Sequence, residues 1–223
     1  MKHLIISALC LMTMLSIPSV VDAQSDETSP AFSPKVIVKY SVLNILDPET
    51  AVQLAAEYLF KPKMGFQQQL GYIFKNPAYA DYEFTRGIRA RSEMRFYYGK
   101  KRRMKSYVAP EVMYKFVQQY GIRDFSREGG AYQQTIDFRA NRNVIGFIPK
   151  IGLTNNIFER KFAVDFAFGI GVKAVYYNSN VPSDVFDEDF FISDTFFNLG
   201  LRNSGHEVLP NLYFGLLLGF VAK

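Results

Sequence analysis

Eight segments of this sequence, each about ten residues long, alternate apolar side chains with polar or small ones. In the clearest segment, 87–98, Ile88 and Phe96 fall on one parity while Arg89 and Arg95 fall on the other. Successive side chains of a strand point to opposite faces, so this segment predicts a strand with one apolar wall and one charged wall. The apolar walls carry too much aromatic and aliphatic surface to leave in water. A charged interior with an apolar exterior is the arrangement of a β-barrel that lies in lipid.

The hydropathy of the chain excludes a helical membrane protein. Hydrophobic residues make up 48% of the sequence, yet the mean hydropathy is only −0.04. After residue 23 no apolar run reaches the ~18 residues that a spanning helix needs. A membrane protein without such runs must be a closed barrel, because hydrocarbon cannot satisfy an open sheet edge. We therefore predict an all-β protein, an eight-stranded antiparallel up-and-down transmembrane β-barrel, with strands at 36–46, 51–60, 66–75, 87–98, 106–117, 144–154, 162–176 and 211–220.

The N-terminus predicts a secretory signal peptide. It has a basic start, an apolar core at 4–20, and small residues at Val21 and Ala23 that favour cleavage after Ala23. Cys10 is the single cysteine and lies in this segment, so the mature chain is expected to have no disulfide. Such a leader directs the chain through the inner membrane, and the barrel pattern directs it to the outer membrane of a Gram-negative cell. The predicted parts are a signal peptide at 1–23, a flexible lead-in at 24–34 and the barrel at 35–223.

The connections between predicted strands alternate in length, which predicts an orientation. The connections after the second, fourth and sixth strands are short, at 61–65, 99–105 and 155–161. The connections after the third, fifth and seventh strands are longer, at 76–86, 118–143 and 178–210. Short turns of such barrels face the periplasm and long loops face outward. Because function concentrates in loops on a rigid scaffold, we predict that an extracellular or envelope protein partner binds the loops 118–143 and 178–210.

The inward parity of the predicted strands collects charged residues. The interior of an eight-stranded barrel is only wide enough for side chains to fill, and an unpaired buried charge is costly. We therefore predict a paired charge network that plugs the lumen, in which Glu111 lies near Arg91 or Arg95 and Glu93 near Lys115. An ion pathway along the same row is the alternative. The predicted lumen residues are Lys39, Glu57, Arg89, Arg91, Glu93, Arg95, Glu111, Lys115, Lys150, Asp165 and Lys173.

Two prolines interrupt the predicted strands on the outward parity. Pro110 lies within 106–117 and Pro149 lies within 144–154. A proline removes one donor from the ladder and normally marks an edge or a bulge. We therefore predict a β-bulge at each proline.

The charge pattern does not favour nucleic acid, metal or cofactor binding. The net charge is +5, but the basic residues alternate along strands or cluster in the turn 100–103, without a nucleic-acid motif. The acidic run at 184–189 lacks the spacing of a calcium loop, so a solvated loop is the better interpretation. Gly169 and Gly171 lie inside a predicted strand, with no phosphate loop after them. Membrane lipid is the expected environment, and no cofactor is expected.

His206 is the only histidine of the expected mature chain and is the one candidate for catalysis. It lies beside Ser204 and Glu207, and some small outer-membrane barrels are lipid A acyl hydrolases or acyltransferases that use such residues. A nucleophile, a base and an orienting group normally come from separate elements rather than from one short run. We therefore predict that the protein is not an enzyme, and lipid A modification through His206 stays as an alternative.

The strand sequences carry a family resemblance. The segments 89–98 and 107–114, together with the terminal 211–220, resemble small outer-membrane barrels of the OmpA-transmembrane and OmpX type. More narrowly, the chain resembles a barrel family of Bacteroidota-type outer membranes that has no assigned activity. The resemblance implies a fold and a location. We predict a structural or interaction protein of the outer membrane, with a narrow porin-like channel and a lipid A-modifying enzyme as the alternatives.

Overall fold

The computed structural model describes residues 35–43, 50–75, 84–98, 104–127, 131–157, 161–180 and 205–222. All of them belong to one compact unit, Ser33–Lys223. The predicted signal peptide and lead-in, 1–34, lie outside the described residues. No helix in the described part of the chain is long and apolar enough to cross a membrane.

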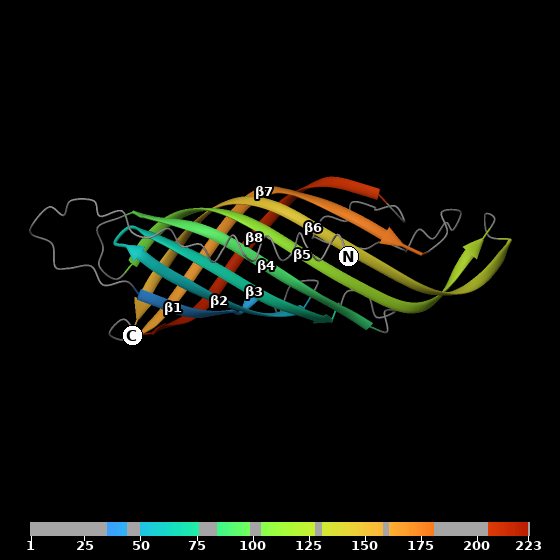
Figure 1. Cartoon of the computed structure of the whole chain (residues 1–223), viewed down its shortest axis with the longest axis horizontal. Coiled ribbons are helices and arrows are strands. Elements are labelled where there is room, and N and C mark those ends of the chain that lie inside the picture. The colour runs from blue at the N-terminus through green and yellow to red at the C-terminus, as the bar shows by residue number, and fades with distance from the viewer. Residues whose placement is uncertain are drawn as a thin grey trace, which may run out of the picture. The chain divides into compact units, whose positions relative to one another are not determined.

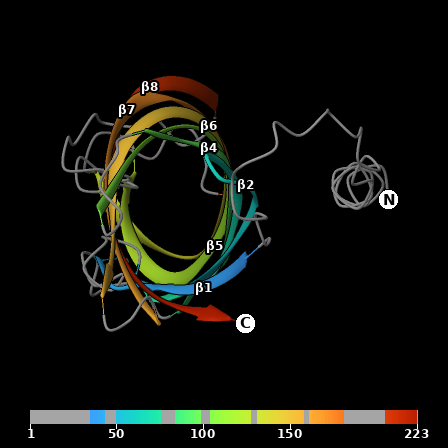
Figure 2. The same cartoon turned by 90° about the vertical axis from the view of Figure 1, so that its left-hand side faces the viewer.

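Eight strands form a closed antiparallel barrel in which each strand pairs with its neighbours in sequence and β1 pairs with β8 (Figures 1 and 2). The predicted all-β, eight-stranded up-and-down barrel is therefore confirmed. The strands are β1 Lys35–Ser41, β2 Thr50–Lys61, β3 Met64–Lys75, β4 Phe84–Tyr98, β5 Met104–Arg127, β6 Tyr132–Ile157, β7 Phe162–Ser179 and β8 Gly205–Ala222.

The two ends of the barrel differ in their connections. At one end, here called the short-turn end, brief connections join β2 to β3, β4 to β5 and β6 to β7, and β1 begins where β8 finishes. At the other end, here called the hairpin end, β5 and β6 continue past their neighbours (Figure 1). β3 and β7 finish at the hairpin end, and β4 and β8 begin there. The connections 76–83 and 181–204 are outside the described residues.

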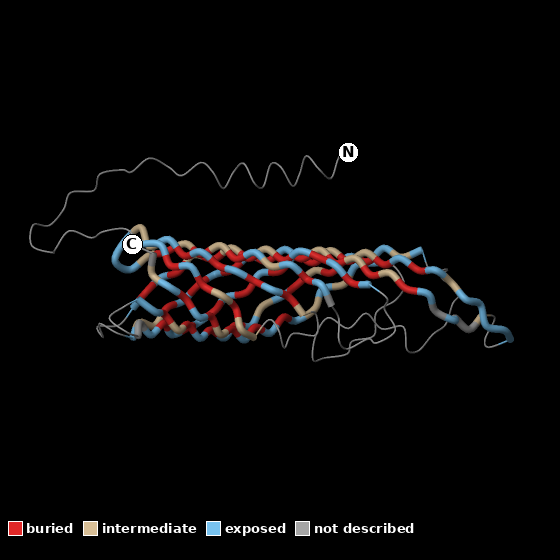
Figure 3. The backbone as a smooth tube through the Cα atoms, turned by 90° about the horizontal axis from the view of Figure 1, so that it is seen from below, coloured by how far each residue is buried: buried red, intermediate tan, exposed pale blue. Residues whose placement is uncertain are grey.

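Burial alternates along the strands (Figure 3). The buried wall mixes charged and polar side chains with apolar ones, whereas the exposed wall is lined by large apolar side chains. On β2, Gln53 is 1% exposed while the next residue, Leu54, is 56% exposed. On β4, Arg89 is 3% exposed while Ile88 is 53% exposed. A soluble barrel would show the opposite pattern, because burying apolar surface is its main source of stability.

The predicted bulges at the two prolines are wrong. Pro110 and Pro149 lie directly opposite each other across the β5–β6 pair, whose register is continuous. The ladder is interrupted where each proline strand meets its other neighbour: between β5 and β4 at Pro110, and between β6 and β7 at Pro149. The register is the same on either side of each interruption. The lost ladder contacts are thus tolerated without an extra residue. The register shifts in the described strands lie between β2 and β3.

The predicted loop 118–143 is also wrong, because most of it is strand. β5 and β6 pair from Met104 opposite Asn155 as far as Arg127 opposite Tyr132. β4 accompanies β5 only up to Phe84 opposite Tyr120, and β7 accompanies β6 only up to Ala140. Residues 121–127 and 132–139 therefore form a two-stranded extension, here called the hairpin extension. The predicted loop 178–210 is shortened at both ends by β7 and β8, and β1 is shorter than predicted.

Candidate functional site

The lumen holds a concentration of buried charge. Every residue predicted to face it is buried, and the structure adds Arg142, which is 2% exposed and which the sequence pattern places in a loop. The alternation Ala140, Arg142, Val144 continues the inward parity of β6 and is the signal that identifies Arg142. The predicted residues are between 0% and 7% exposed: Lys39, Glu57, Arg89, Arg91, Glu93, Arg95, Glu111, Lys115, Lys150, Asp165 and Lys173.

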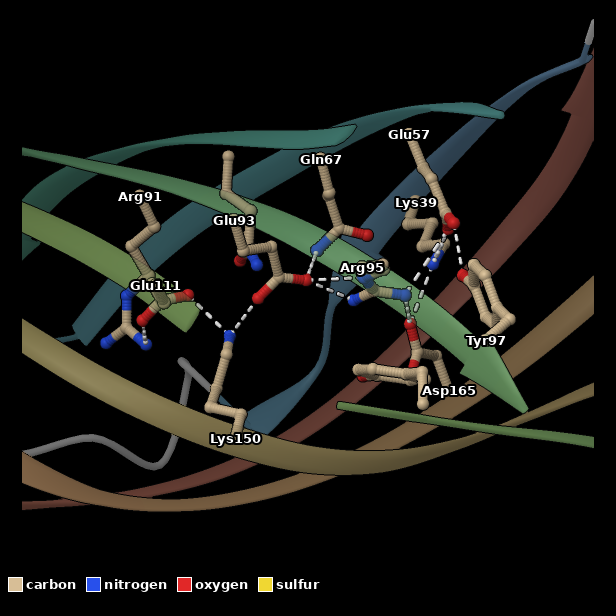
Figure 4. A network of polar contacts seen from close by, with 12 residues as sticks. Lys39, Glu57, Gln67, Arg91, Glu93, Arg95, Tyr97, Glu111, Lys150 and Asp165 are labelled. Atoms are coloured by element: carbon tan, nitrogen blue, oxygen red, sulfur yellow. Dashed lines mark hydrogen bonds and ion pairs between the residues drawn. The ribbon is translucent and has the colours of Figure 1, made fainter. Parts of the chain in front are cut away.

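The first part of the network lies toward the short-turn end and joins β1, β2, β4 and β7 (Figure 4). Lys39 Nζ lies 2.5 Å from Glu57 Oε2 and 2.7 Å from Asp165 Oδ2. Arg95 Nη1 lies 3.3 Å from the same Glu57 oxygen and forms an ion pair with Asp165. Two cations and two carboxylates thus share contacts, and all four side chains are fully buried.

Two tyrosines complete this part. The Tyr107 hydroxyl donates to Asp165 Oδ1 at 2.7 Å, and the Tyr97 hydroxyl donates to Glu57. The Arg95 guanidinium also lies over the Tyr107 ring, 4.3 Å from its centroid. The tyrosines therefore supply donors that buried carboxylates need, besides filling space. A tyrosine so near a strand end would be expected in an interfacial aromatic girdle, so the inward role of Tyr97 is a finding of the structure.

Glu93 connects the first part of the network to the second. Its Oε1 accepts from Arg95 Nε at 2.5 Å and from Gln67 Nε2 at 2.8 Å, while its Oε2 forms an ion pair with Lys150. Lys150 Nζ in turn lies 2.5 Å from Glu111 Oε2. Ion pairs therefore continue from β1 through the barrel to β5 and β6.

The predicted pair of Glu111 and Arg91 is present, with 3.4 Å between Arg91 Nη1 and Glu111 Oε1. The predicted contact between Glu93 and Lys115 is replaced by contacts of Glu93 with other cations. The register places Glu93 opposite Glu111 and places Lys115 opposite Arg89. The cations that the structure brings to Glu93 are Arg95 and Lys150.

Inward glycines make room for inward tyrosines. A Cβ atom on Gly152 would lie 2.2 Å from the Tyr107 ring, and one on Gly215 would lie 2.3 Å from the Tyr213 hydroxyl. The Tyr213 ring lies 4.3 Å from Lys150 Nζ and 4.6 Å from the Arg91 guanidinium carbon, measured to its centroid. The sequence signal for these tyrosines is a glycine on the same parity, either two residues along or on the adjacent strand.

The charge along the lumen is uneven. Among the described residues, the buried carboxylates are those of Glu57, Glu93, Glu111 and Asp165, and all lie in the network just described. Four further buried cations lie toward the hairpin end, and each of them has an interaction of its own. The buried charges of the described residues are therefore balanced toward the short-turn end, and those toward the hairpin end are cations, with the half-buried Glu207 on the same inner wall. These four cations are Arg89, Lys115, Arg142 and Lys173.

Of the three residues considered for catalysis, the structure describes His206 and Glu207. His206 lies on β8, is exposed, and stacks on Tyr176 with 6.3 Å between ring centroids. Glu207 follows it in the strand and points to the opposite wall, so it cannot orient the His206 ring. Ser204 and the acidic run 184–189 lie outside the described residues. Within the described part of the chain, no group of His, Cys, Asp and Glu side chains is arranged to hold a metal ion.

Chemically, the network presents salt-bridged charges whose side chains are buried. Its carboxylates accept hydrogen bonds from lysine, arginine, tyrosine or glutamine. Such an arrangement holds strands together and fills space. Because a buried ion pair leaves a costly charge behind when one partner is removed, the network also couples the strands that contribute to it.

Comparisons with known proteins agree with this fold. A major outer membrane protein from Thermus thermophilus superposes with a TM-score of 0.51 at 8% identity, over 86% of this chain and 100% of that chain. Neisserial surface protein A (NspA) gives a TM-score of 0.39 at 10% identity, over 84% of this chain and 93% of that chain. At such identities the likeness to the Thermus protein concerns the fold alone. No protein-family model matches the sequence, and no curated protein is significantly similar to it.

Proposed function

We propose that this barrel spans the outer membrane of a Gram-negative cell as a structural or interaction protein, with its lumen plugged by charged side chains and its hairpin end facing outward. The observation that carries the proposal is the inversion of the barrel walls. Arg95 is completely buried while Leu70, Phe214 and Val208 on the exterior are 63%, 63% and 70% exposed. Soluble monomers rarely expose contiguous apolar surface on this scale.

The height of the apolar exterior fits a bilayer. On β6 the outward residues are apolar from Ile145 to Leu153, and they are bounded by Asn143 and Asn155. A tilted strand crosses the hydrocarbon core in about 9–11 residues. We call the apolar exterior between these limits the apolar band. Its dimensions support a barrel in a membrane, and the fold shared with the Thermus protein supports the outer membrane.

A plugged lumen is favoured over a channel by the way in which the network crosses the interior. The ion-paired residues come from β1, β2, β4, β5, β6 and β7, so they span the lumen from wall to wall. Opening a path would separate buried ion pairs, and leaving a buried charge without its partner is strongly unfavourable.

The hairpin extension supports an interaction role. Its strand edges lie beyond the ends of β4 and β7, and Ile122 and Tyr132 on it are 56% and 47% exposed. An exposed strand edge is a template for pairing with another chain. We infer that the extension presents a binding surface for an envelope or extracellular protein, in place of the predicted loop 118–143. Most of the predicted loop 178–210 lies outside the described residues.

Planar-bilayer recording tests the plugged lumen directly. Wild-type protein refolded into a bilayer is expected to give no steady single-channel steps. Steady steps from the wild type would overturn the plug and favour the narrow channel. The enzyme alternative has its own readout, because expression would then shift the mass of lipid A. N-terminal sequencing of the mature protein should begin at Gln24 if the predicted signal peptide is cleaved.

A further inference from the structure

A polar patch lies on the exterior of the barrel, at the edge of the apolar band that faces the hairpin end. Two rows of outward-facing residues cross β4, β5 and β6 there. One row is Phe84, Tyr120 and Arg139, and the other is Arg86, Gln118 and Asn141. We call these two rows the arginine patch. The next row toward the short-turn end begins the apolar band with Ile88 and Phe116.

The two arginines of the patch are held around one tyrosine. Arg86 Nε donates to Gln118 Oε1 at 3.0 Å, and its Nη2 donates to the Tyr120 hydroxyl at 3.4 Å. The guanidinium carbons of Arg86 and Arg139 lie 5.8 Å and 4.7 Å from the centroid of the Tyr120 ring. Gln118 is itself fixed by a 3.0 Å hydrogen bond from its Nε2 to Asn141 Oδ1. Both cations are therefore preorganised on a surface that remains exposed.

Among the described residues, the carboxylates nearest the patch on the same face lie on the hairpin extension. Asp137 is one row beyond Arg139, and Asp124 is opposite Thr135, whose hydroxyl donates to it at 2.5 Å. The patch itself contains cations, amides and aromatic rings, and no acidic residue. Its electrostatic complement is thus an anion.

We propose that the arginine patch binds the phosphate groups of a lipid in the outer leaflet. This inference rests on the proposed membrane location and orientation. Lipid phosphates lie immediately outside the hydrocarbon layer of a membrane. The patch lies at the corresponding level of the barrel, because it is next to Ile88 and Phe116, where the apolar band begins. A guanidinium matches a phosphate with two parallel hydrogen bonds, and an arginine at a membrane interface keeps its stem on apolar surface while its head reaches the polar layer.

A lipid is favoured over a free phosphate by the surroundings of the patch. The outward side chains below it, including Ile88, Phe116 and Ile145, form a continuous apolar surface on which acyl chains can pack. A soluble phosphate would use only the arginines. A phosphorylated lipid would use both the arginines and the apolar surface.

Native mass spectrometry of the folded barrel in detergent tests this proposal. The probes are bisphosphorylated lipid A, the same lipid A with its phosphates removed, and phosphatidylcholine. The wild type should retain the bisphosphorylated lipid preferentially. Arg86→Gln combined with Arg139→Gln should reduce that retention about tenfold or more, since charge-assisted hydrogen bonds are lost. Lys61→Gln combined with Lys63→Gln removes the same charge at the short-turn end and should retain the lipid.

Several results would overturn the assignment. Equal retention of the dephosphorylated lipid would show that acyl chains alone are recognised, and displacement by excess inorganic phosphate would point to a free-anion site. Retention of the bisphosphorylated lipid by the double arginine variant would show that the arginine patch does not bind it. Insertion of each variant into phosphatidylcholine vesicles is checked first by the gel mobility of unheated samples, and Arg139→Gln alone replaces the double variant if that fails to insert. A wild type that does not insert would contradict the membrane location instead.

Discussion

Glu93 is the residue through which the two parts of the lumen network are joined. It contacts Arg95 on one side and Lys150 on the other, and Lys150 carries the connection on to Glu111. None of these side chains is exposed to solvent. Because each charge has more than one partner, removing one of them affects several strands at once.

Replacing Glu111 with alanine is expected to destabilise the barrel by about 3–5 kcal/mol, because the buried Lys150 and Arg91 lose their shared partner. Urea unfolding from lipid vesicles, followed by tyrosine fluorescence, measures the loss. The matched control is Lys63→Ala, an exposed residue of the turn between β2 and β3, which should change the midpoint little. Equal urea midpoints for the two variants would show that the ion-pair network does not stabilise the barrel.

Replacing Gly152 with alanine is expected to displace the Tyr107 ring and weaken its hydrogen bond to Asp165, since the new methyl group would lie 2.2 Å from the ring. Overpacking of this kind costs about 1–3 kcal/mol. Gly71→Ala is the matched control, because its new methyl group would lie 3.3 Å from the nearest atom, the Gln53 Cβ. Thermal unfolding in detergent should rank Gly152→Ala as the less stable, and the reverse order would contradict the close contact.

The residue types of the lumen were predictable from the sequence, whereas the partners were not. Parity alone identifies Arg91, Glu93 and Glu111 as inward, because apolar neighbours flank each of them or share their strand. Which charged residues form ion pairs depends on the register of the strands. In the structure Glu93 forms an ion pair with Lys150, whereas Lys115 lies opposite Arg89. Tyr97 and Tyr107 were missed because a tyrosine suits either wall of a membrane barrel.

At the scale of the element, the outward-facing residues of the strands differ in polarity between the apolar band and the region beyond it. Within the band, the outward residues must be apolar, so alternation reveals the strand. Beyond it, outward positions such as Gln118, Arg139 and Asn141 face a polar layer or water, and the alternation disappears. That is why the sequence pattern predicts short versions of β5 and β6 with a loop between them.

The walls of the strands can be tested with single arginines. Arginine at the outward positions Val112, Phe168 or Leu216 should cost about 2–4 kcal/mol near the bilayer midplane. Arginine at the exposed Gln133 of the hairpin extension, beyond the apolar band, should cost less, because that position lies outside the band. Folding yield into lipid vesicles, measured by gel mobility, compares the four variants. Equal yields would mean that the exterior does not contact hydrocarbon.

At the scale of the whole molecule, the two ends of the barrel have different characters. The short-turn end carries the balanced ion-pair network, and the hairpin end carries the additional lumen cations, the arginine patch and the hairpin extension. The proposed orientation places the hairpin end outside the cell. An outward location suits a binding surface, because loops and hairpins there meet other molecules first.

Trypsin added to intact cells tests this orientation. We expect cleavage after Arg127, at the end of β5 in the hairpin extension, and protection of the basic turn 100–103 between β4 and β5. Immunoblotting with antibodies to either end of the chain identifies the fragments, and cells with a permeabilised outer membrane provide the control in which the turn becomes accessible. Cleavage in the turn 100–103 of intact cells would invert the topology.

The pairing of β1 with β8 means that the ring has no structural first or last strand. Val36 lies opposite Ala222, so the two strand ends meet at the same rim. A short linker joining these ends would require no rearrangement, and new termini could open at the turn of Pro62 and Lys63 on that rim. Circular permutants of the barrel are therefore expected to assemble with all eight strands in their present neighbourhoods. The order in which strands are synthesised would change while the set of lumen contacts would not.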